Sequence, residues 1–313
     1  MIIADKNTIR KPKFAVLLAA YNGSLYIREQ IETILNQVDV SLKIFISIDL
    51  SSDDTDLVVK KISENNNNIK LLSTGNRYGS ASSNFYRLIK EVDFSEFDYV
   101  AFADQDDVWL PGKLARAHAK IIETGSAAYS SDFVAFWNNG KTKYFKKSSA
   151  QKKYDFIFES PGPGCTIVLG TKLALDFKNL IITKESAVQN IAYHDWLVYA
   201  FARSSSKSYK WFIDNHSQIL YRQHLSNQIG VNNGFAAYKS RLNKVLNGWW
   251  FNQSKIICDV IEFSESKIYS YGLCGGKLGV LYLALNARNC RRALREQLYF
   301  IALCIMFCLG RKT

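Results

Sequence analysis

Short apolar runs alternate with amphipathic segments along the first 125 residues of the chain. The runs span four to seven residues, and polar residues follow each of them. They cover residues 14–20, 43–49, 69–72 and 99–103, and the segments with helical spacing cover residues 27–38, 80–91 and 111–123, with another helix opened by 51–55. Strands that alternate with helices at this interval are typical of a parallel sheet with helices on both faces. We therefore predict an α/β fold with a mostly parallel central sheet.

Beyond residue 125 the pattern is mixed. Strand-like runs cover residues 127–137, 165–169, 211–213 and 219–221, and residues 195–202 have helical spacing. From residue 235 the chain is mainly helical, with Phe235, Tyr238, Leu242, Val245 and Leu246 along one predicted face. We predict an α/β domain over residues 1–230 and a helical segment over residues 231–313.

An acidic cluster follows the apolar run 99–103. Asp104, Asp106 and Asp107 place three carboxylates within four residues. Two unit charges about 4 Å apart repel by roughly 4 kcal/mol at an effective dielectric constant near 20, so such a cluster favours a bound cation. A single aspartate would suffice as a helix cap, which is the alternative reading, and three exceed that need. Because hard cations prefer oxygen ligands, the pattern predicts Mg²⁺ or Mn²⁺.

Three further polar groups follow predicted strands or begin a predicted helix. Asp49 with Ser51, Ser52 and Asp53 either contacts a nucleotide base, beside the loop of Tyr21 and Asn22, or caps the next helix. Asp195 is a candidate general base or again a cap. Arg222 and His224 combine a cation with a candidate imidazole ligand, although an isolated histidine is often structural.

Charge is distributed unevenly along the 313 residues. The net charge is +12, and residues 231–313 hold 12 Lys and Arg against 4 Asp and Glu, which is +8 of that total. A basic segment rich in apolar helices favours an anionic membrane surface, and the absence of a basic run interleaved with aromatic residues speaks against nucleic acid. The apolar window 298–309 is too short to cross a bilayer, so we expect it to lie in the interface.

The cysteines and the N-terminus indicate the compartment. The six cysteines form no Cys-x-x-Cys pair and have no histidine at zinc spacing, so we expect reduced thiols. Residues 1–13 mix charges without an apolar stretch of the kind found in secretory signals. We expect a peripheral protein on the cytoplasmic face of the bacterial inner membrane.

Taken together, these motifs resemble those of a family 2 glycosyltransferase with the GT-A fold, a Rossmann-like architecture, and more narrowly the bacterial rhamnosyltransferase-like members. The resemblance spans about residues 13–230 and rests on the order and spacing of seven motifs. They are residues 20–23 (Ala-Tyr-Asn-Gly), Asp49 with 51–55, 79–85, 104–109 (Asp-Gln-Asp-Asp-Val-Trp), 164–166 (Gly-Cys-Thr), 194–196 (His-Asp-Trp) and 221–224 (Tyr-Arg-Gln-His).

The resemblance implies a role for each candidate residue. Binding of the nucleotide-sugar donor falls to Tyr21, Asn22, Asp49, Asp104 and Arg222, metal binding to Asp106 and His224, and proton removal from the acceptor hydroxyl to Asp195. Two positions depart from the family pattern. Leu50 follows the aspartate of the second strand where the family usually has Asp-Asp-Gly-Ser, and His194 precedes Asp195 where a Glu-Asp pair is common.

The resulting functional hypothesis is an inverting, metal-dependent transfer of a sugar, rhamnose from dTDP-rhamnose, to a lipid-linked oligosaccharide in surface polysaccharide synthesis. A nucleotidyltransferase would share the acidic pair but would need a basic, Gly-rich loop after the first strand. A dinucleotide-dependent oxidoreductase would need Gly-x-Gly-x-x-Gly there, and only Gly23 is present. A non-catalytic, membrane-bound carbohydrate-binding or scaffold protein stays open as the other alternative.

Overall fold

The computed structural model describes residues 10–204, 209–224 and 247–310. Its centre is a seven-stranded sheet with the order β10-β6-β9-β4-β1-β2-β3. The strands are β1 (Lys13–Ala20), β2 (Ser41–Ile48), β3 (Ile69–Leu71), β4 (Tyr99–Asp104), β6 (Ala128–Ser131), β9 (Val168–Gly170) and β10 (Trp211–Asp214). Only β9 runs antiparallel to its neighbours β4 and β6 within this sheet. The predicted, mostly parallel sheet is confirmed.

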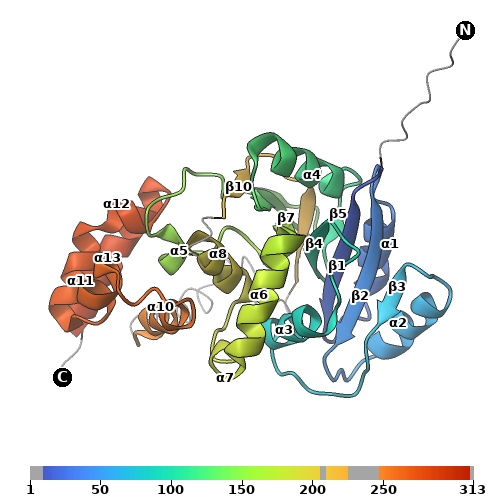
Figure 1. The fold of residues 1–313 in the computed structure, drawn as a ribbon, viewed down its shortest axis with the longest axis horizontal. Helices are drawn as coiled ribbons and strands as arrows, with labels where there is room; N and C mark the ends of the chain where they lie inside the picture. Colours follow the sequence, from blue (N-terminus) through green and yellow to red (C-terminus); the bar gives the residue numbers. More distant parts are fainter. Residues whose placement is uncertain (1–9, 205–208, 225–246, 311–313) are drawn as a thin grey trace, which may run out of the picture.

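Helices cover both faces of the sheet (Figure 1). Alternate residues of β1 point to opposite sides, as strand geometry requires. Phe14, Val16 and Leu18 share one core with α1 (Ile27–Leu35), α2 (Thr55–Glu64) and α4 (Lys113–Thr124). Ala15 and Leu17 share the other core with α3 (Ala81–Glu91), α6 (Thr171–Thr183) and α8 (His194–Ser204). Because β1 is buried on both sides, its uninterrupted apolar run is explained.

A second, four-stranded sheet lies beside the carboxyl end of β4. Its order is β5-β11-β7-β8, with β5 (Val108–Trp109), β7 (Phe133–Trp137), β8 (Thr142–Phe145) and β11 (Ile219–Gln223). Strand β11 pairs antiparallel with β5 and parallel with β7. This pairing brings the residues after β11 next to the acidic cluster that precedes β5.

Two predicted strands differ from the structure. Residues 127–137 were expected as one strand but form β6 and β7, which belong to different sheets. The two strands are separated at Asp132. Its buried carboxylate accepts hydrogen bonds from the backbone amides of Lys147 and Ser148. Residues 165–169 were likewise expected as one strand, but a 3₁₀ turn, η1 (Gly164–Thr166), precedes β9, because the Thr166 backbone amide and hydroxyl both bond to the Pro163 carbonyl.

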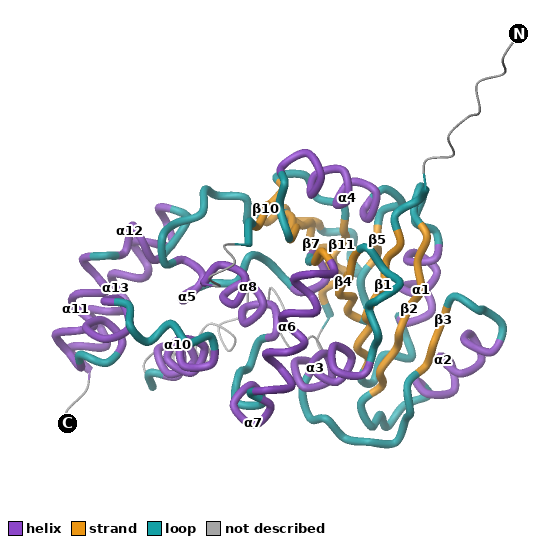
Figure 2. The backbone as a smooth tube through the Cα atoms, in the orientation of Figure 1, coloured by secondary structure: helices purple, strands orange, loops and turns teal. Residues whose placement is uncertain are grey.

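The C-terminal helices gather at the end of the molecule opposite β1–β3 (Figures 1 and 2). They are α10 (Trp249–Val260), the π-helical turn η2 (Ile268–Leu273), α11 (Gly276–Leu285), α12 (Ala287–Cys290) and α13 (Leu294–Gly310). Leu283 and Phe300 are buried in the same core as α5 (Asp155–Phe158) and α8. The predicted helix from residue 235 to 246 and the boundary expected at residue 230 lie outside the described residues.

Candidate active site

The loops that follow β1 and β2 are clasped together by polar contacts. Asn22 has a positive φ of 47°, a conformation that asparagine tolerates better than most residues. Its side-chain oxygen accepts a hydrogen bond from the Ser52 backbone amide (2.8 Å). The backbone amide of Asn22 donates to the Ser51 hydroxyl (3.0 Å). The Asp53 carboxylate accepts from the Ser24 amide at 3.0 Å. These contacts place Tyr21 and Asn22 next to the end of β2, as predicted.

The acidic cluster is tied to the same loop through Gln105. The Gln105 side chain accepts a hydrogen bond from the Tyr21 amide (2.7 Å) and donates one to the Tyr21 carbonyl (2.8 Å). A Cβ atom on Gly23 would lie 2.2 Å from the Gln105 side-chain oxygen, so any larger residue there would displace this amide. The Tyr21 ring stays 46% exposed, open to a ligand.

Asp49 binds the backbone of residues 78 and 79, a contact that the sequence did not suggest. It is 5% exposed, and its two carboxylate oxygens accept hydrogen bonds from the amides of Leu50 (2.9 Å), Tyr78 (2.7 Å) and Gly79 (2.8 Å). The carboxylate thus fixes residues 78 and 79 at the end of β2. Its direct contact with a nucleotide stays a prediction.

Asp106 contacts His224 just beyond the carboxyl end of β4. The Asp106 carboxylate lies 2.8 Å from Nε2 of His224, and the His224 ring packs 5.0 Å from that of Tyr26. Burial, followed by the charges of Asp106 and Asp195, raises the pKa of Asp104 to about 7. The structure therefore brings Asp106 and the predicted imidazole together, although 118 residues separate Asp106 from His224 in sequence.

Arg222 holds the backbone of Asp106 in place. Its side chain donates to the Asp106 carbonyl (2.8 Å) and forms an ion pair with Glu29. Its guanidinium also lies 4.7 Å from the Tyr26 ring and 4.6 Å from the Phe136 ring. These contacts hold the guanidinium next to the acidic cluster. A cation within β11 can therefore support the acidic residues. A contact between Arg222 and the donor stays a prediction.

Asp107 points inward rather than to the open side. It is 1% exposed, and one carboxylate oxygen accepts a hydrogen bond from the Arg222 amide at 3.1 Å. Burial, followed by the charges of Asp106 and Asp104, raises its pKa well above the usual range. Burial lowers the pKa of the neighbouring Lys113 to about 8. Asp107 therefore joins the strand-end loop to β11 and is unsuited to contact a substrate.

One set of side chains among the described residues is close enough to hold a cation. Asp104, Asp107 and Cys165 bring three ligand atoms within 4.8 Å of one another. Cys165 is fully buried and burial raises the pKa of its thiol, so this set offers a protonated sulfur out of reach of a diphosphate. Hard cations favour oxygen ligands and usually share them with substrate phosphates. Binding of Mg²⁺ or Mn²⁺ by Asp106 and His224, beside Asp104, therefore stays a prediction.

Asp195 lies in the first turn of α8 and faces the acidic cluster. Burial raises its pKa to about 6, against the lowering effects of the Trp196 amide (2.7 Å), Lys147 and Ser160. Its charge in turn contributes to the raised pKa of Asp104. A carboxylate poised near neutral pH, beside a candidate metal site, has the properties of a general base.

His194 has a structural environment. Its ring stacks on Phe85 with centroids 4.0 Å apart, and burial lowers its pKa to about 3. A Cβ atom on Gly164 would lie 2.5 Å from its Nε2 atom. The neutral ring therefore fills the space beside Gly164, and of this pair only Asp195 stays a candidate proton acceptor.

Comparison with known proteins places this site in a family. Glycosyl transferase family 2 matches residues 15–225. The "dTDP-rhamnosyl transferase RfbG" of Shigella flexneri is 37% identical over 290 residues, which are 92% of this chain and 99% of that protein. A Campylobacter jejuni protein, "GalNAc(5)-diNAcBac-PP-undecaprenol beta-1,3-glucosyltransferase", is 27% identical over 150 residues, 47% of this chain and 48% of its own length.

Two solved structures share the fold. Residues 1–349 of S. aureus TarS, in complex with UDP-GlcNAc, superpose with a TM-score of 0.50 at 16% identity, covering 95% of this chain and 89% of that one. The mannosyltransferase PcManGT of Pyrobaculum calidifontis, in complex with GDP-Man and Mn²⁺, gives a TM-score of 0.50 at 12% identity, covering 98% and 89%. The expected GT-A fold is confirmed, and the chain is a glycosyltransferase that belongs to glycosyl transferase family 2.

Proposed function

We propose that the enzyme transfers rhamnose from dTDP-rhamnose to a lipid-linked saccharide, with inversion at the anomeric carbon and with the help of a divalent cation. The observation that carries this proposal is the contact of Asp106 with His224 beside Asp104, whose pKa is raised by the charges of both Asp106 and Asp195. The donor is suggested by the printed name of the Shigella flexneri relative, which aligns with nearly the whole chain.

The reaction needs one proton acceptor and one stabilised leaving group. Asp195 removes the proton from the acceptor hydroxyl, and the oxygen attacks the anomeric carbon as the bond to dTDP breaks. The electron pair of that bond leaves with dTDP, so the sugar configuration inverts in a single displacement. Mg²⁺ or Mn²⁺ held by Asp104, Asp106 and His224 would supply positive charge that stabilises the departing diphosphate.

The donor nucleotide would lie over the loops after β1 and β2. There the exposed Tyr21 ring and the clasped Asn22 loop offer an aromatic surface and backbone groups. Asp49 would act on the base or ribose directly, or through the segment that it holds at residues 78 and 79. Arg222 would keep Asp106 and His224 aligned with the diphosphate.

The acceptor would approach from the C-terminal helices, which expose a large apolar surface. On α11, Leu278 is 80% and Leu285 86% exposed. On α13, seven exposed positions carry no charge, namely Leu294, Leu298, Tyr299, Ala302, Ile305, Met306 and Leu309. None of the helices among the described residues has both the length and the apolar character needed to cross a membrane.

The charges around this surface favour an anionic membrane. Between residues 266 and 313 the chain carries eight Lys and Arg but a single acidic residue, Glu296, which pairs with Arg291. An apolar face flanked by cations binds the interface of anionic lipids through burial and charge together. We place the enzyme peripherally on the cytoplasmic face of the inner membrane, where a lipid-linked acceptor is available.

Direct assay of transfer tests the proposal. The full-length enzyme, dTDP-rhamnose, Mn²⁺ and membranes containing lipid-linked saccharides should yield a product one deoxyhexose heavier by mass spectrometry, and chelation should abolish it. UDP-glucose and UDP-GlcNAc serve as competing donors. Turnover with one of these instead of dTDP-rhamnose would refute the donor, and calorimetry that shows no metal-dependent affinity for any dTDP- or UDP-sugar would favour the carbohydrate-binding alternative.

A further inference from the structure

The loop that leads into α8 is held by a side chain of α3. Residues 190–193 lie directly before α8, whose second residue is Asp195. Ser82 is 3% exposed, and its hydroxyl donates to the Ala192 carbonyl (2.7 Å) and accepts from the His194 backbone amide (3.0 Å). The backbone on the N-terminal side of Asp195 is therefore fixed to α3.

Gln253 of α10 bonds to the same loop. It is 5% exposed; its side-chain oxygen accepts from the Ala192 backbone amide (2.9 Å), and its side-chain nitrogen donates to the Asn190 carbonyl (3.0 Å). A primary amide carries a donor and an acceptor side by side, so it can pair with both groups at once. The rings of Trp249, also on α10, and Tyr193 lie 5.8 Å apart in an edge-to-face arrangement. Helix α10 therefore contacts the loop through two of its side chains.

The two partners in this contact differ in burial, and the difference decides what loss of Gln253 would do. The Gln253 side chain is buried, and buried polar groups in folded proteins are nearly always hydrogen-bonded, so its amide keeps the loop in one position. Asn190 and Ala192 are themselves exposed, so water can bond to their backbone once the glutamine is replaced. A variant without this amide should therefore fold, while the loop before Asp195 loses its fixed position.

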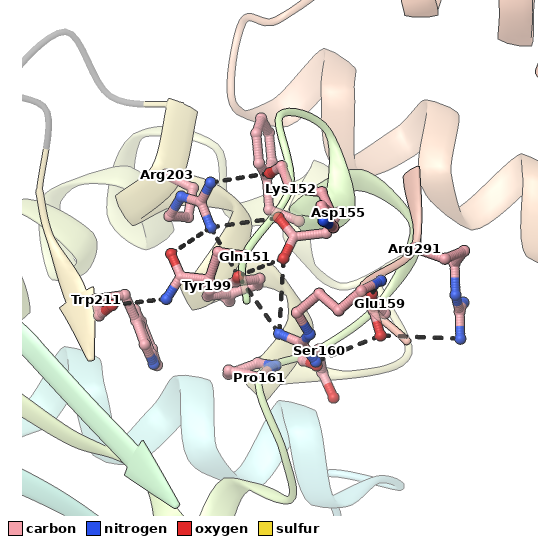
Figure 3. Close-up of polar contacts among 12 residues, drawn as sticks. Gln151, Lys152, Asp155, Glu159, Ser160, Pro161, Tyr199, Arg203, Trp211 and Arg291 are labelled. Atoms are coloured by element: carbon pink, nitrogen blue, oxygen red, sulfur yellow. Dashed lines mark hydrogen bonds and ion pairs between the residues drawn. The ribbon is translucent and has the colours of Figure 1, made fainter. Parts of the chain in front are cut away.

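The far end of α8 is held by different contacts (Figure 3). The Asp155 carboxylate accepts a hydrogen bond from the Tyr199 hydroxyl (2.9 Å) and forms an ion pair with Arg203 (3.2 Å). These contacts join α8 to α5 and do not involve Gln253. Replacing Gln253 should consequently affect the turn that carries Asp195 and leave the rest of α8 in place.

We propose that Gln253 is a positioning residue for Asp195: it holds residues 190 and 192, and together with Ser82 it fixes the first turn of α8, which carries the base. The proposal rests on the proposed function, in which Asp195 removes the proton from the acceptor hydroxyl. Gln253 lies beyond residues 15–225, which match the family. The C-terminal helices therefore support the geometry of the active site in addition to forming the proposed membrane surface.

The test compares Gln253→Met with Gln297→Met in the full-length protein. Methionine is unbranched like glutamine and lacks its hydrogen-bonding amide. Gln297 is a matched control because it is 8% exposed on α13 and donates to the Arg291 carbonyl (2.9 Å) instead of to the loop before α8.

Hydrogen exchange resolved to single residues gives the first readout. In Gln253→Met the Ala192 amide loses its acceptor and should exchange faster whether or not the loop moves. The decisive amide is that of His194, which bonds to Ser82 and not to Gln253. It should exchange about tenfold faster in Gln253→Met and at the wild-type rate in Gln297→Met. This readout requires no substrate.

Kinetics give the second readout. With dTDP-rhamnose, Mn²⁺ and membranes that contain lipid-linked saccharides, kcat for the release of dTDP should fall about tenfold or more in Gln253→Met. The Kd of dTDP in calorimetry should stay unchanged, because the proposed donor loops follow β1 and β2. Gln297→Met should keep the wild-type kcat. If Gln253 acts through the base, the same replacement should cost nothing further in an Asp195→Asn background.

Three outcomes would overturn the proposal. They are wild-type exchange of the His194 amide in Gln253→Met, wild-type kcat in that variant, and an equal fold-loss with and without the Asp195 carboxylate. If Gln253→Met does not fold, Gln253→Asn decides by the same readouts, because it keeps a polar amide that is one carbon too short to reach both backbone groups. A wild-type enzyme that does not turn over dTDP-rhamnose, or a fully active Asp195→Asn variant, would instead refute the proposed function. The exchange of the His194 amide would then still decide whether Gln253 fixes the start of α8.

Discussion

Replacing Asp195 by asparagine should abolish turnover and stabilise the protein at the same time. The loss of activity follows from removal of the proton acceptor, which is typically worth about 10²- to 10⁴-fold in rate. The gain in stability follows from burial, which raises the pKa of this carboxyl from 3.8 to about 6. A shift of about two units corresponds to about 3 kcal/mol of cost for keeping the ionised group in the folded protein.

The sign of the pH dependence is fixed by that shift. Below pH 3.8 the carboxyl is protonated in both the folded and the unfolded chain, so the cost is absent. It develops between pH 3.8 and about 6 and is fully present above, where both states are ionised. Asparagine carries no charge at any pH. The free energy of unfolding of Asp195→Asn should therefore exceed that of the wild type by about 2 to 3 kcal/mol at pH 8, and the difference should shrink toward pH 4.

Urea denaturation followed by circular dichroism at pH 8, 6 and 4 measures this difference. The raised pKa of Asp195 also predicts the pH dependence of the rate. At saturating metal and donor, kcat of the wild type should fall about tenfold between pH 7 and pH 5 as Asp195 takes up a proton. Equal or lower stability of the asparagine variant at pH 8 would refute the reasoning from burial. An acid limb that follows the metal concentration would assign it to the ligand Asp104 instead.

Three other changes test separate parts of the site. Gly23→Ala should weaken donor binding at least tenfold in calorimetry, because the new Cβ would displace the Gln105 amide that clasps the β1 loop; unchanged affinity would show that the loop adapts. Asp106→Ala should remove the metal dependence of nucleotide binding and leave metal-free binding as it is, and persistent dependence would move the cation elsewhere. Leu285→Ser with Leu298→Ser should weaken binding to anionic vesicles by about tenfold or more in sedimentation assays, because exposed leucines lose their apolar contact with lipid; equal binding would exclude this face.

The fold could be predicted largely because its determinants are local. A strand buried on both faces gives an unbroken apolar run, and β1, β2 and β4 each did so within one or two residues of their observed bounds. The antiparallel direction of β9 leaves no comparable mark in the sequence. The break at Asp132 was equally invisible, because the hydrogen bonds that stabilise it come from the backbone of residues 147 and 148.

The candidate site was predicted as a set of residue types, while its internal contacts came only with the structure. Asp106 and Asp195 could be named because they follow a strand and open a helix. The hydrogen bonds between Gln105 and Tyr21 join residues 84 positions apart, and the contact of His224 with Asp106 joins residues 118 positions apart. No short motif encodes such partners, since tertiary packing brings them together.

The shared hydrophobic core of the C-terminal helices and the catalytic half also bears on how such enzymes diversify. Leu283 of α11 and Phe300 of α13 pack in one cluster with residues of α5 and α8. The C-terminal helices are therefore not an exchangeable module. A chimera that joins this α/β domain to the C-terminal helices of a distant relative would disturb that packing. It should therefore lose activity rather than gain a new specificity. Acceptor preference in this lineage should therefore change by substitutions spread over both halves together, and enzyme engineering should treat the chain as one unit.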